Sequence, residues 1–386
     1  MKREGFTENA TGRLMPNLDG QLTFVPDPLP PRIDGFGRTT VQLLAEAERR
    51  LGELAGVGRT LPNPHLLIGP FLRREAVLSS RIEGTYATAE QLLLYEALPR
   101  EEPATPDVRE VGNYVKALEY GLARLKSLPV SLRLIREIHG VLLQGVRGQE
   151  YTPGEFRRRQ NYIGHRGQPI QDARFVPPPV TEMEKCLDQF ERFLHSGSDL
   201  PFLLQLALIH YQFEAIHPFL DGNGRLGRLL ISLLMSERGV LPQPLLYLSA
   251  FFEHNRDAYM DHLLAVSQRG AWIDWIHFLL RGVAEQAADA TRRSQRLLDL
   301  RQQYRDRLQA TPRTSALALR LVDEIFAFPA LTARKARDVL QVTTVSAQRN
   351  INKLVKAGIL AERTGRARNR VYVASEILST IEAEGA

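Results

Sequence analysis

The sequence predicts a mainly α-helical fold that is interrupted by one β-hairpin and followed by a separate basic domain. Three observations support this prediction. Apolar residues recur at three- and four-residue steps through most of residues 39–308, as they do on one face of a helix. Residues 157–179 break that pattern with short apolar runs around a glycine- and proline-bearing turn. Residues 331–374 carry ten basic and two acidic side chains, a local charge of +8 against +6 for the whole chain.

The length and composition indicate a globular protein of two or three domains, since 386 residues with 44% hydrophobic content can bury a sizeable core. A pI of about 9.5 permits polyanionic partners without requiring them. Cys186 is the single cysteine, which excludes an internal disulfide and a cysteine-based zinc site and favours a reducing compartment. With no apolar run of the kind that signal peptides or membrane spans need, we expect a cytoplasmic protein with no membrane partner.

The N-terminal segment Thr23 to Gly37 is rich in proline and glycine, which predicts an extended arm on the surface over residues 1–38. Residues 39–125 are expected to form an N-terminal helical region and residues 126–285 a helical core. The charged residues 286–313 suit a helical linker, and residues 314–386 form the last domain. Helices are predicted from Thr39 onward, at Phe71–Glu83, Val108–Ser127, Ser131–Gln144, Thr181–His195, Phe202–Ala215, Arg225–Arg238 and Trp272–Leu308.

One hairpin is expected inside the helical core. The runs Asn161-Tyr162-Ile163 and Arg174-Phe175-Val176 flank a turn that contains Gly164, Gly167 and Pro169. The three prolines 177–179 end the second strand, because proline cannot donate to a sheet ladder.

The strongest chemical signal is a glycine-rich turn at the start of a predicted helix. In Asp221-Gly222-Asn223-Gly224, successive backbone N–H groups can turn inward to form a nest that binds phosphate oxygens. Arg225 and Arg228 are three residues apart and therefore share one face of the helix that follows. Both can reach the same anion.

Two further side chains complete this arrangement. The carboxylate of Asp221 is a hard oxygen ligand for a Mg²⁺ ion that bridges phosphates. His217 lies just upstream, within reach of whatever the nest holds, and the helix N-terminus and nearby arginines are expected to keep its imidazole neutral, as a general base requires. The turn fits neither the P-loop nor the dinucleotide-binding pattern. A zinc site using His210 and His217 is disfavoured, because no third ligand follows at a recognisable spacing.

The stretch from His217 to Arg228 resembles the Fic motif, His-Pro-Phe-x-Asp/Glu-Gly-Asn-Gly-Arg-x-x-Arg, and matches it at every fixed position. The resemblance extends over roughly Thr39 to Leu280 and implies a Fic-type helical bundle in which the predicted hairpin is the flap. Proteins of this family commonly transfer AMP from ATP to a Tyr, Thr or Ser hydroxyl and release pyrophosphate. The acceptor would be a target protein or the protein itself.

By this resemblance His217 would be the catalytic base and Asp221 the Mg²⁺ ligand, and Arg228 would hold the terminal phosphate. The flap strand around Tyr162 would offer edge hydrogen bonds to an extended target peptide. The full set of implied nucleotide-binding residues is Gly222, Asn223, Gly224, Arg225, Leu226, Gly227, Arg228, Glu83, Ile163, Gly164 and Tyr259.

A second motif suggests inhibition. Ser79-Ser80-Arg81-Ile82-Glu83-Gly84 resembles the family's inhibitory pattern, Ser/Thr-x-x-x-Glu-Gly/Asn, and its position implies an N-terminal inhibitory helix. Glu83 could pair with Arg228 and remove the cation that orients the γ-phosphate. Ser79, one turn earlier on the same helix face, could support Glu83. Taken alone, the string also fits a surface glutamate before a helix-ending glycine.

The last domain has an order of elements that resembles a winged helix-turn-helix: three helices and then a hairpin around Gly365. In a DNA-binding role, the third helix would enter the major groove and the wing would meet phosphates or the minor groove. The candidate DNA-binding residues are Gln348, Arg349, Asn352 and Lys356 on the helix and Arg366, Arg368 and Arg370 on the wing. Dimerisation, giving a homodimer, and the binding of a protein target are the alternatives for this domain.

The sequence therefore favours an autoinhibited AMP transferase with ATP and Mg²⁺ as substrate and metal. Three alternatives remain open: a DNA-binding regulator whose Fic portion senses nucleotide, an enzyme that removes AMP with Glu83 as base, and an enzyme that transfers a different phosphate-containing group.

Overall fold

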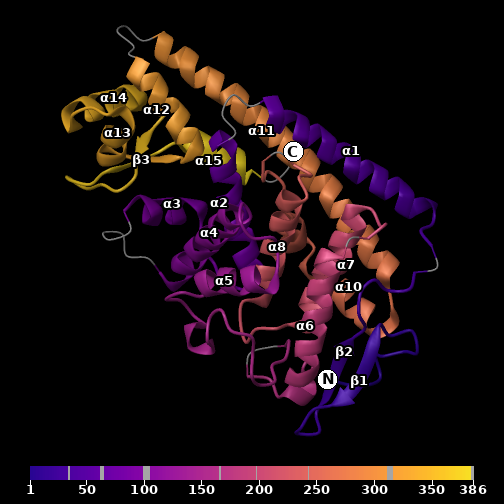
Figure 1. Cartoon of the computed structure of the whole chain (residues 1–386). Coiled ribbons are helices and arrows are strands. Elements are labelled where there is room, and N and C mark those ends of the chain that lie inside the picture. Colours follow the sequence, from indigo (N-terminus) through magenta and orange to yellow (C-terminus); the bar gives the residue numbers. More distant parts are fainter. Residues whose placement is uncertain are drawn as a thin grey trace. The chain divides into compact units, whose positions relative to one another are not determined.

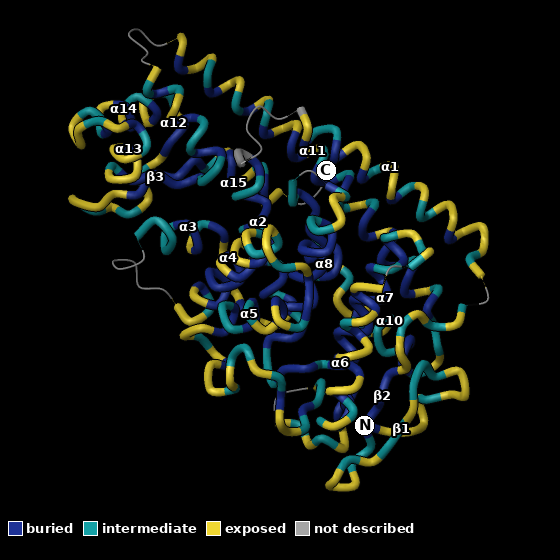
Figure 2. Tube along the Cα trace, in the orientation of Figure 1, coloured by how far each residue is buried: buried dark blue, intermediate teal, exposed yellow. Residues whose placement is uncertain are grey.

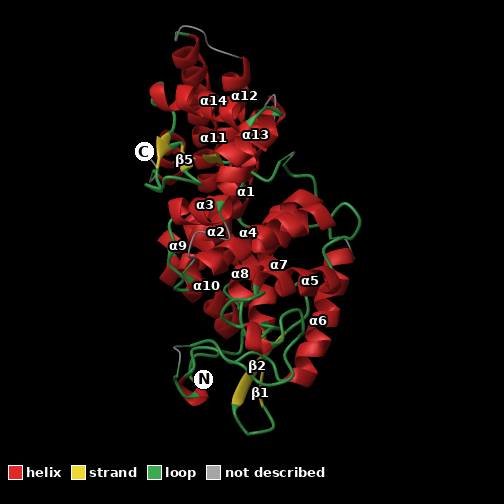
Figure 3. Ribbon diagram, turned by 90° about the vertical axis from the view of Figure 1, so that its left-hand side faces the viewer, coloured by secondary structure: helices red, strands yellow, loops and turns green. Residues whose placement is uncertain are grey.

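The computed structural model describes residues 1–33, 35–60, 65–98, 105–164, 167–196, 198–241, 243–310 and 316–383. Helices dominate, and the strands are few and short (Figure 3), so the predicted mainly α-helical fold is confirmed. The chain divides into two compact units: the first comprises Met1–Arg50, Lys116–Val240 and Leu248–Glu285, and the second comprises Leu51–Val115, Leu241–Tyr247 and Gln286–Ala386. In the described ranges, we find no helix with an apolar stretch long enough to cross a membrane.

The first unit holds the hairpin and the central helices (Figure 1). Three of its helices continue into the second unit: α1 (Arg38–Thr60), α4 (Pro106–Arg124) and α11 (Trp272–Gln309). Its own elements are β1 (Gly12–Pro16), β2 (Leu22–Pro26), α5 (Leu132–Leu142), the 3₁₀ turns η1 (Gln149–Tyr151) and η2 (Ile170–Asp172), α6 (Val180–His195), α7 (Phe202–Ile216), α8 (Asn223–Glu237), α9 (Ser249–His254) and α10 (Arg256–Arg269).

The second unit combines the helices that precede the first unit's core with the basic C-terminal residues. Its elements are α2 (His65–Ile82), α3 (Ala89–Ala97), α12 (Ala316–Ala327), β3 (Ala330–Thr332), α13 (Ala333–Leu340), α14 (Thr344–Lys356), β4 (Ala361–Glu362), β5 (Val371–Val373) and α15 (Ser375–Glu382). The three helices and two strands that the sequence predicts here are present, and β3 and α15 are additions.

Helix α7 is the centre of the first unit. Almost every residue from Leu203 to Ile216 is buried, and Figure 2 shows α7 and α8 dark blue over most of their length. A helix that is apolar on all sides is stable only when other elements surround it, and α6, α8, α10 and β2 pack against α7. The segment that joins α7 to α8 is therefore held between two buried helices.

The N-terminal arm differs from the prediction. Residues Gly12–Pro16 and Leu22–Pro26 form an antiparallel hairpin, and Phe24 and Val25 are buried, so the expectation of an extended surface arm is wrong for this stretch. The Phe24 ring lies 5.4 Å from Phe6 and 5.7 Å from Phe175, and its N–H donates to Val176 O at 2.9 Å. These long-range contacts outweigh the local effect of Pro26 and the prolines that follow it.

The expected hairpin at residues 157–179 is reduced to a single bridging pair. Ile163 and Phe175 exchange both backbone hydrogen bonds, at 2.8 and 3.2 Å. Pro177 to Pro179 prevent further pairing after Phe175, and the turn forms the 3₁₀ segment Ile170–Asp172. His165 and Arg166 of the expected turn lie outside the described residues.

The C-terminal residues share a core with α2 and α3. Strands β3, β5 and β4 form an antiparallel sheet in that order, and Leu93 of α3 packs with Ala330, Val371, Val373 and Leu378. Helix α12 lies so close to α2 that a Cβ on Gly69 would come within 2.0 Å of the carbonyl oxygen of Ala327. Only glycine permits this approach.

The charged half of α11 packs against other elements, whereas the sequence suggested a spacer. Arg293, which is 2% exposed, bonds to Asp289 at 2.6 Å and donates to the carbonyls of Thr380, Ile381 and Ala383 at the end of α15. Asp289 also lies 3.7 Å from Arg74 of α2. The Asp289–Arg293 pair thus links α2, α11 and α15.

We expect Asp289→Ala to destabilise the second unit by about 3–5 kcal/mol, because it leaves a guanidinium buried without its counter-ion. A fall in the melting temperature measures the effect. Asp299→Ala is the matched control, as Asp299 is exposed ten residues further along the same helix. Equal melting temperatures for the two variants would contradict the role of Asp289.

Candidate active site

His217 ends helix α7 in the left-handed conformation, with φ 48° and ψ 61°. This region is unfavourable for a residue with a Cβ, so surrounding contacts must hold it. The His217 N–H donates to Phe213 O at 3.0 Å, which closes the last helical turn. The ring Nδ1 lies 3.3 Å from Glu214 O. Because a carbonyl only accepts, this contact places the proton on Nδ1 and the lone pair on Nε2.

The loop after His217 is fixed by Asn223, the first residue of α8. Its side-chain oxygen accepts from Phe219 N at 2.9 Å, and its amide donates to Phe219 O at 2.8 Å. Asn223 is buried. Its side chain therefore shapes the loop from both the oxygen and the amide nitrogen.

His139 of α5 holds the same loop from another side. Its Nδ1 accepts from Gly154 N at 2.9 Å, so Nε2 carries the proton and donates to Asp221 O at 3.0 Å. Its ring stacks on Phe219 with 3.7 Å between centroids. Burial lowers the pKa of His139 to about 4, which keeps the ring neutral. Sequence reasoning missed this residue.

Arg157 and Asn161 bind the loop through backbone carbonyls. The Arg157 N–H donates to Pro218 O at 2.9 Å, and Arg157 Nε donates to His217 O at 3.0 Å. The Asn161 amide donates to His217 O at 3.2 Å and to Phe219 O at 2.7 Å. Neither residue was a sequence candidate, since a side chain that binds a distant carbonyl leaves no sequence pattern.

Helix α8 begins with the predicted anion nest. Gly222 is the N-cap residue with φ 77°, and it has no side chain to occupy the first N–H groups. Arg225, Leu226, Gly227 and Arg228 follow in the first two turns, and all four are buried. A Cβ on Gly227 would lie 2.2 Å from Glu214 Oε1, so a side chain here would displace the carboxylate of Glu214.

Asp221 fits a magnesium ion that is shared with phosphates. Its carboxylate is 32% exposed, its Oδ1 accepts from Gly222 N at 2.6 Å, and it lies 3.9 Å from Arg225 Nη2. No group of three possible His, Cys, Asp or Glu ligands occurs within the described ranges. A single carboxylate suits Mg²⁺, which usually takes one or two protein ligands together with phosphates and water.

Two other candidates lie in the core of the first unit. The hydroxyl of Tyr259 and His210 Nε2 are 2.7 Å apart, and His210 Nδ1 lies 3.3 Å from Gly227 O. Tyr259 is buried and stacks on Phe252. Both nitrogens of His210 have partners, which agrees with the rejection of a zinc site. The placement of Tyr259 favours a packing role.

The predicted inhibitory motif lies at the end of helix α2 in the second unit. Ser79 is buried, the helix ends at Ile82, and Glu83 is exposed in the turn that follows. Gly84 adopts φ 81°, which agrees with its predicted role as a helix stop. Glu83 N and Gly84 N donate to Ser80 O and Arg81 O.

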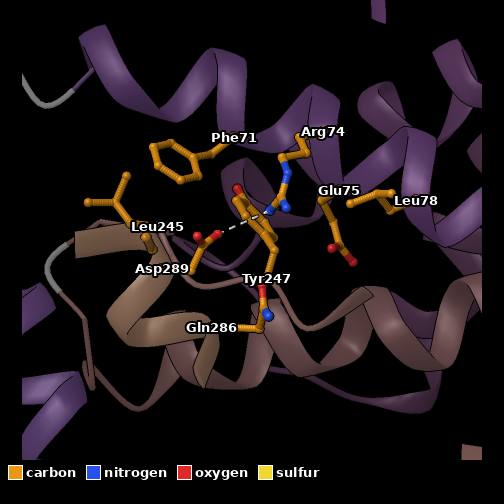
Figure 4. Close-up of a pocket in the computed structure, with 9 residues that line it drawn as sticks. Phe71, Arg74, Glu75, Leu78, Leu245, Tyr247, Gln286 and Asp289 are labelled. Atoms are coloured by element: carbon orange, nitrogen blue, oxygen red, sulfur yellow. Dashed lines mark ion pairs between the residues drawn. The ribbon is translucent and has the colours of Figure 1, made fainter. Parts of the chain in front are cut away.

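Helix α2 encloses a small void in the second unit. Arg74 points across it to Asp289 (Figure 4). Its volume of about 10 Å³ leaves room for one water molecule at most, so it is not a nucleotide site. The lining residues are Phe71, Arg74, Glu75, Leu78, Leu245, Tyr247, Gln286, Asp289 and Ala290.

The C-terminal candidates lie on α14 and on the loop between β4 and β5. Gln348 joins α14 to β5, because its amide donates to Tyr372 Oη at 3.0 Å, and it also donates to Asn352 Oδ1 on α14 at 2.9 Å. Arg370 Nε donates to Arg366 O at 2.8 Å. The exposed candidates are Arg349, Asn352, Lys356, Arg368 and Arg370, and Gln348 and Arg366 are half-buried.

Protonation of His210 links stability to pH. Burial, and then the charge of Arg228, lowers its pKa to about 3, against about 6.5 when unfolded. The unfolded chain therefore binds a proton that the folded chain does not. This stabilisation is complete above pH ~6.5, and as pH falls toward ~3 the free energy of unfolding drops by about 1.4 kcal/mol per pH unit.

His210→Gln should reduce the slope by about 1.4 kcal/mol per pH unit, as measured by denaturant unfolding between pH ~6.5 and ~4.5, whereas the contribution of buried His139 remains. His195→Gln, an exposed position at the end of α6, should retain the full slope. A His210→Gln protein with the wild-type slope would refute this assignment.

The sequence is similar to proteins named "Protein adenylyltransferase Fic" from several fruit flies. The protein from Drosophila yakuba is 32% identical over 166 residues, which are 42% of this chain and 31% of the relative. The protein from Drosophila virilis is 37% identical over 166 residues, 42% of this chain and 32% of the relative. The chain thus spans about a third of the length of these relatives.

Two solved structures share the fold. A Fic family protein from Desulfovibrio desulfuricans G20 gives a TM-score of 0.54 at 17% identity and covers 91% of this chain and 98% of its own. Fic-1 from C. elegans gives 0.51 at 19% identity, with 67% and 74% covered. Residues 41–123 match the family model "Fic/DOC family N-terminal" and residues 129–235 match "Fic/DOC family". Over residues 41–123 and 129–235 the chain thus carries the two domains of the Fic/DOC family, and its fold is that of solved Fic proteins.

Proposed function

We propose that this protein transfers AMP from ATP to a hydroxyl of a protein target or of itself, with the site at residues 217–228. The observation that carries the proposal is the built loop between α7 and α8. It brings together a histidine with a lone pair on Nε2, a glycine-capped helix N-terminus and two buried arginines. The adenylyltransferase names of the relatives support the same activity.

In this proposal the phosphates of ATP bind at the N-terminus of α8. The backbone N–H groups of Asn223 and Gly224 meet the phosphate oxygens, since Gly222 leaves them uncapped. Arg225 supports this nest, and Arg228, one turn further, holds the terminal phosphate. Mg²⁺ held by Asp221 would neutralise charge on the bridged phosphates.

His217 Nε2 removes the proton of the incoming hydroxyl. The hydroxyl oxygen forms a bond to the α-phosphorus, while the bond from that phosphorus to the oxygen that bridges to the β-phosphate breaks. Pyrophosphate leaves with the electron pair, and the proton remains on the imidazole. The contact of Nδ1–H with Glu214 O orients the ring for this step.

The flap supplies an edge for an extended target segment. Ile163 turns its N–H and carbonyl toward Phe175. Because neighbouring residues in a strand point these groups the other way, Tyr162 and Gly164 offer theirs to the opposite edge. A target strand that pairs there would present its hydroxyl by β-augmentation.

Glu83 would inhibit the resting protein by pairing with Arg228, with Ser79 in support. The exposed position of Glu83 directly after a well-packed helix is compatible with this role. Pairing would withdraw the cation from the terminal phosphate and leave ATP bound in an unproductive orientation.

His217→Ala should lower AMP transfer at least ~100-fold because the general base is lost. Glu83→Gly should raise it roughly 10- to 100-fold, the worth of one charge-assisted hydrogen bond of about 1.5–3 kcal/mol. Incorporation of labelled AMP from ATP in the presence of Mg²⁺ measures both.

Glu83→Gln separates loss of charge from gain of backbone freedom, and Glu48→Gln, at an exposed position on α1, is the neutral control. Unchanged transfer in Glu83→Gly would exclude autoinhibition. Nucleotide binding without transfer in any variant would favour the nucleotide-sensing alternative, and release of AMP from a modified protein would favour AMP removal.

We further propose that the C-terminal residues form a winged helix that binds duplex DNA. One observation favours this function over a merely solvated surface. The two acidic side chains of this basic segment are already engaged: Asp338 pairs with Arg337, and Glu362 accepts from the backbone of Thr364 and Gly365. The surface of α14 and the wing therefore stays strongly positive.

Duplex binding should weaken steeply with salt, with a log–log slope of about −0.9 for each phosphate contact. Replacing Arg349 and Arg368 together by alanine should reduce that slope by about 2, as fluorescence anisotropy would report. Arg296→Ala, at an exposed site on α11, is the control. Absence of binding at low salt would eliminate DNA and leave dimerisation or protein binding for this domain.

A further inference from the structure

Arg157 joins the flap to the loop that carries His217. It begins the flap segment, residues 157–179, yet it is only 1% exposed. Its backbone N–H and its Nε donate to two consecutive carbonyls of the loop, Pro218 O and His217 O, at 2.9 and 3.0 Å. One residue thus contacts the loop through both its backbone and its side chain.

The same guanidinium also reaches both ends of the flap. Nη2 donates to Pro178 O at 2.5 Å, where the flap returns to the core, and Nη1 donates to Arg159 O at 3.4 Å, where it leaves. Ile163 and Phe175, which pair across the flap, lie between these two points. The planar guanidinium therefore connects the outgoing stem, the returning stem and the loop of the base.

The partners of Arg157 argue against a packing role alone. Among the described residues, all its hydrogen-bond partners are backbone carbonyls, and no carboxylate pairs with it. Burial lowers its pKa to about 10. A buried cation without a counter-ion is unfavourable, and an apolar side chain would fill the space more cheaply. A guanidinium can bind several carbonyl oxygens in a fixed geometry, which an apolar side chain cannot do.

The hydrogen bonds of Arg157 help to hold the unusual backbone conformation of His217. Its left-handed backbone is strained for a residue with a Cβ. Its N–H is fixed by Phe213, and its carbonyl is fixed by Arg157 and Asn161. If the guanidinium is lost, the carbonyl keeps one donor, and the imidazole and the flap are no longer tied to a common group.

We propose that Arg157 is a positioning residue that sets the spacing between His217 and the target segment on the flap. This inference rests on the proposed AMP transfer. Arg157 touches neither nucleotide nor target, so its loss should slow transfer to the target hydroxyl and leave nucleotide affinity unchanged. A misplacement of about 1 Å is enough to cost roughly 100-fold in rate.

The test compares Arg157→Lys with Arg158→Lys, each in the full chain and in the Glu83→Gly background. Lysine keeps the charge but cannot span three carbonyls. Arg158 is the matched control, because its side chain is 86% exposed and pairs only with Glu155 among the described residues. Three quantities are measured: kcat for AMP transfer, the Kd of a non-hydrolysable ATP analogue, and amide hydrogen exchange of residues 159–178.

We expect Arg157→Lys to lower kcat by about 10- to 100-fold, to leave Kd within twofold, and to speed exchange in the flap but not in α7. Arg158→Lys should match the parent in all three. Arg157→Ala with added methylguanidinium should regain part of the rate and of the flap protection. If Arg157→Lys fails to fold, Asn161→Ala, which removes the other donor to His217 O, should show the same pattern more weakly.

Parent-like kcat in Arg157→Lys, or a loss of kcat with unchanged flap exchange, would overturn the proposal. If the Glu83→Gly parent transfers no AMP, the proposed function fails. The amide hydrogen exchange of residues 159–178 in Arg157→Lys then still shows whether Arg157 holds the flap to the loop.

Discussion

The structure around the site depends on one chain reversal, the turn from α7 to α8 formed by residues 217–222. Both helices are buried along most of their length, so the turn cannot widen into solvent. It begins at a left-handed histidine and ends at a left-handed glycine. A turn this tight leaves backbone groups without helical partners, and buried groups of that kind need partners from elsewhere.

Those partners come from three directions, and each adds a constraint on the site. Asn223, at the start of α8, closes the loop by binding Phe219. His139 of α5 fixes the carbonyl of Asp221. Arg157, at the start of the flap, fixes the carbonyls of His217 and Pro218. The proposed base His217, the proposed metal ligand Asp221 and the flap are therefore oriented by one hydrogen-bonded network. Preorganisation of this sort is what catalysis by positioning requires.

The sequence predicts the helices and the loop well, because their signals are local. Apolar periodicity gives α5 to α8, and the residues from His217 to Arg228 occur in one continuous string. His139, Arg157 and Asn161 could not be found in the same way. Their partners are carbonyl oxygens, which every residue has, so neither the spacing nor the residue type of the partner marks them. The N-terminal hairpin was missed for a related reason: Phe24 is buried by distant rings, not by its neighbours.

In the second unit, too, elements are held in place by partners that are distant in the sequence. Helix α2, which carries the predicted inhibitory motif, packs against α12 and α15. Gly69 lies against the carbonyl of Ala327 with no space for a methyl group. This contact has an evolutionary consequence. A mutation that lengthens α12 or adds a side chain at Gly69 disturbs both segments at once, so the basic C-terminal module cannot be exchanged between proteins as an independent cassette. A substitution in α2 at this contact therefore requires a compensating substitution in α12.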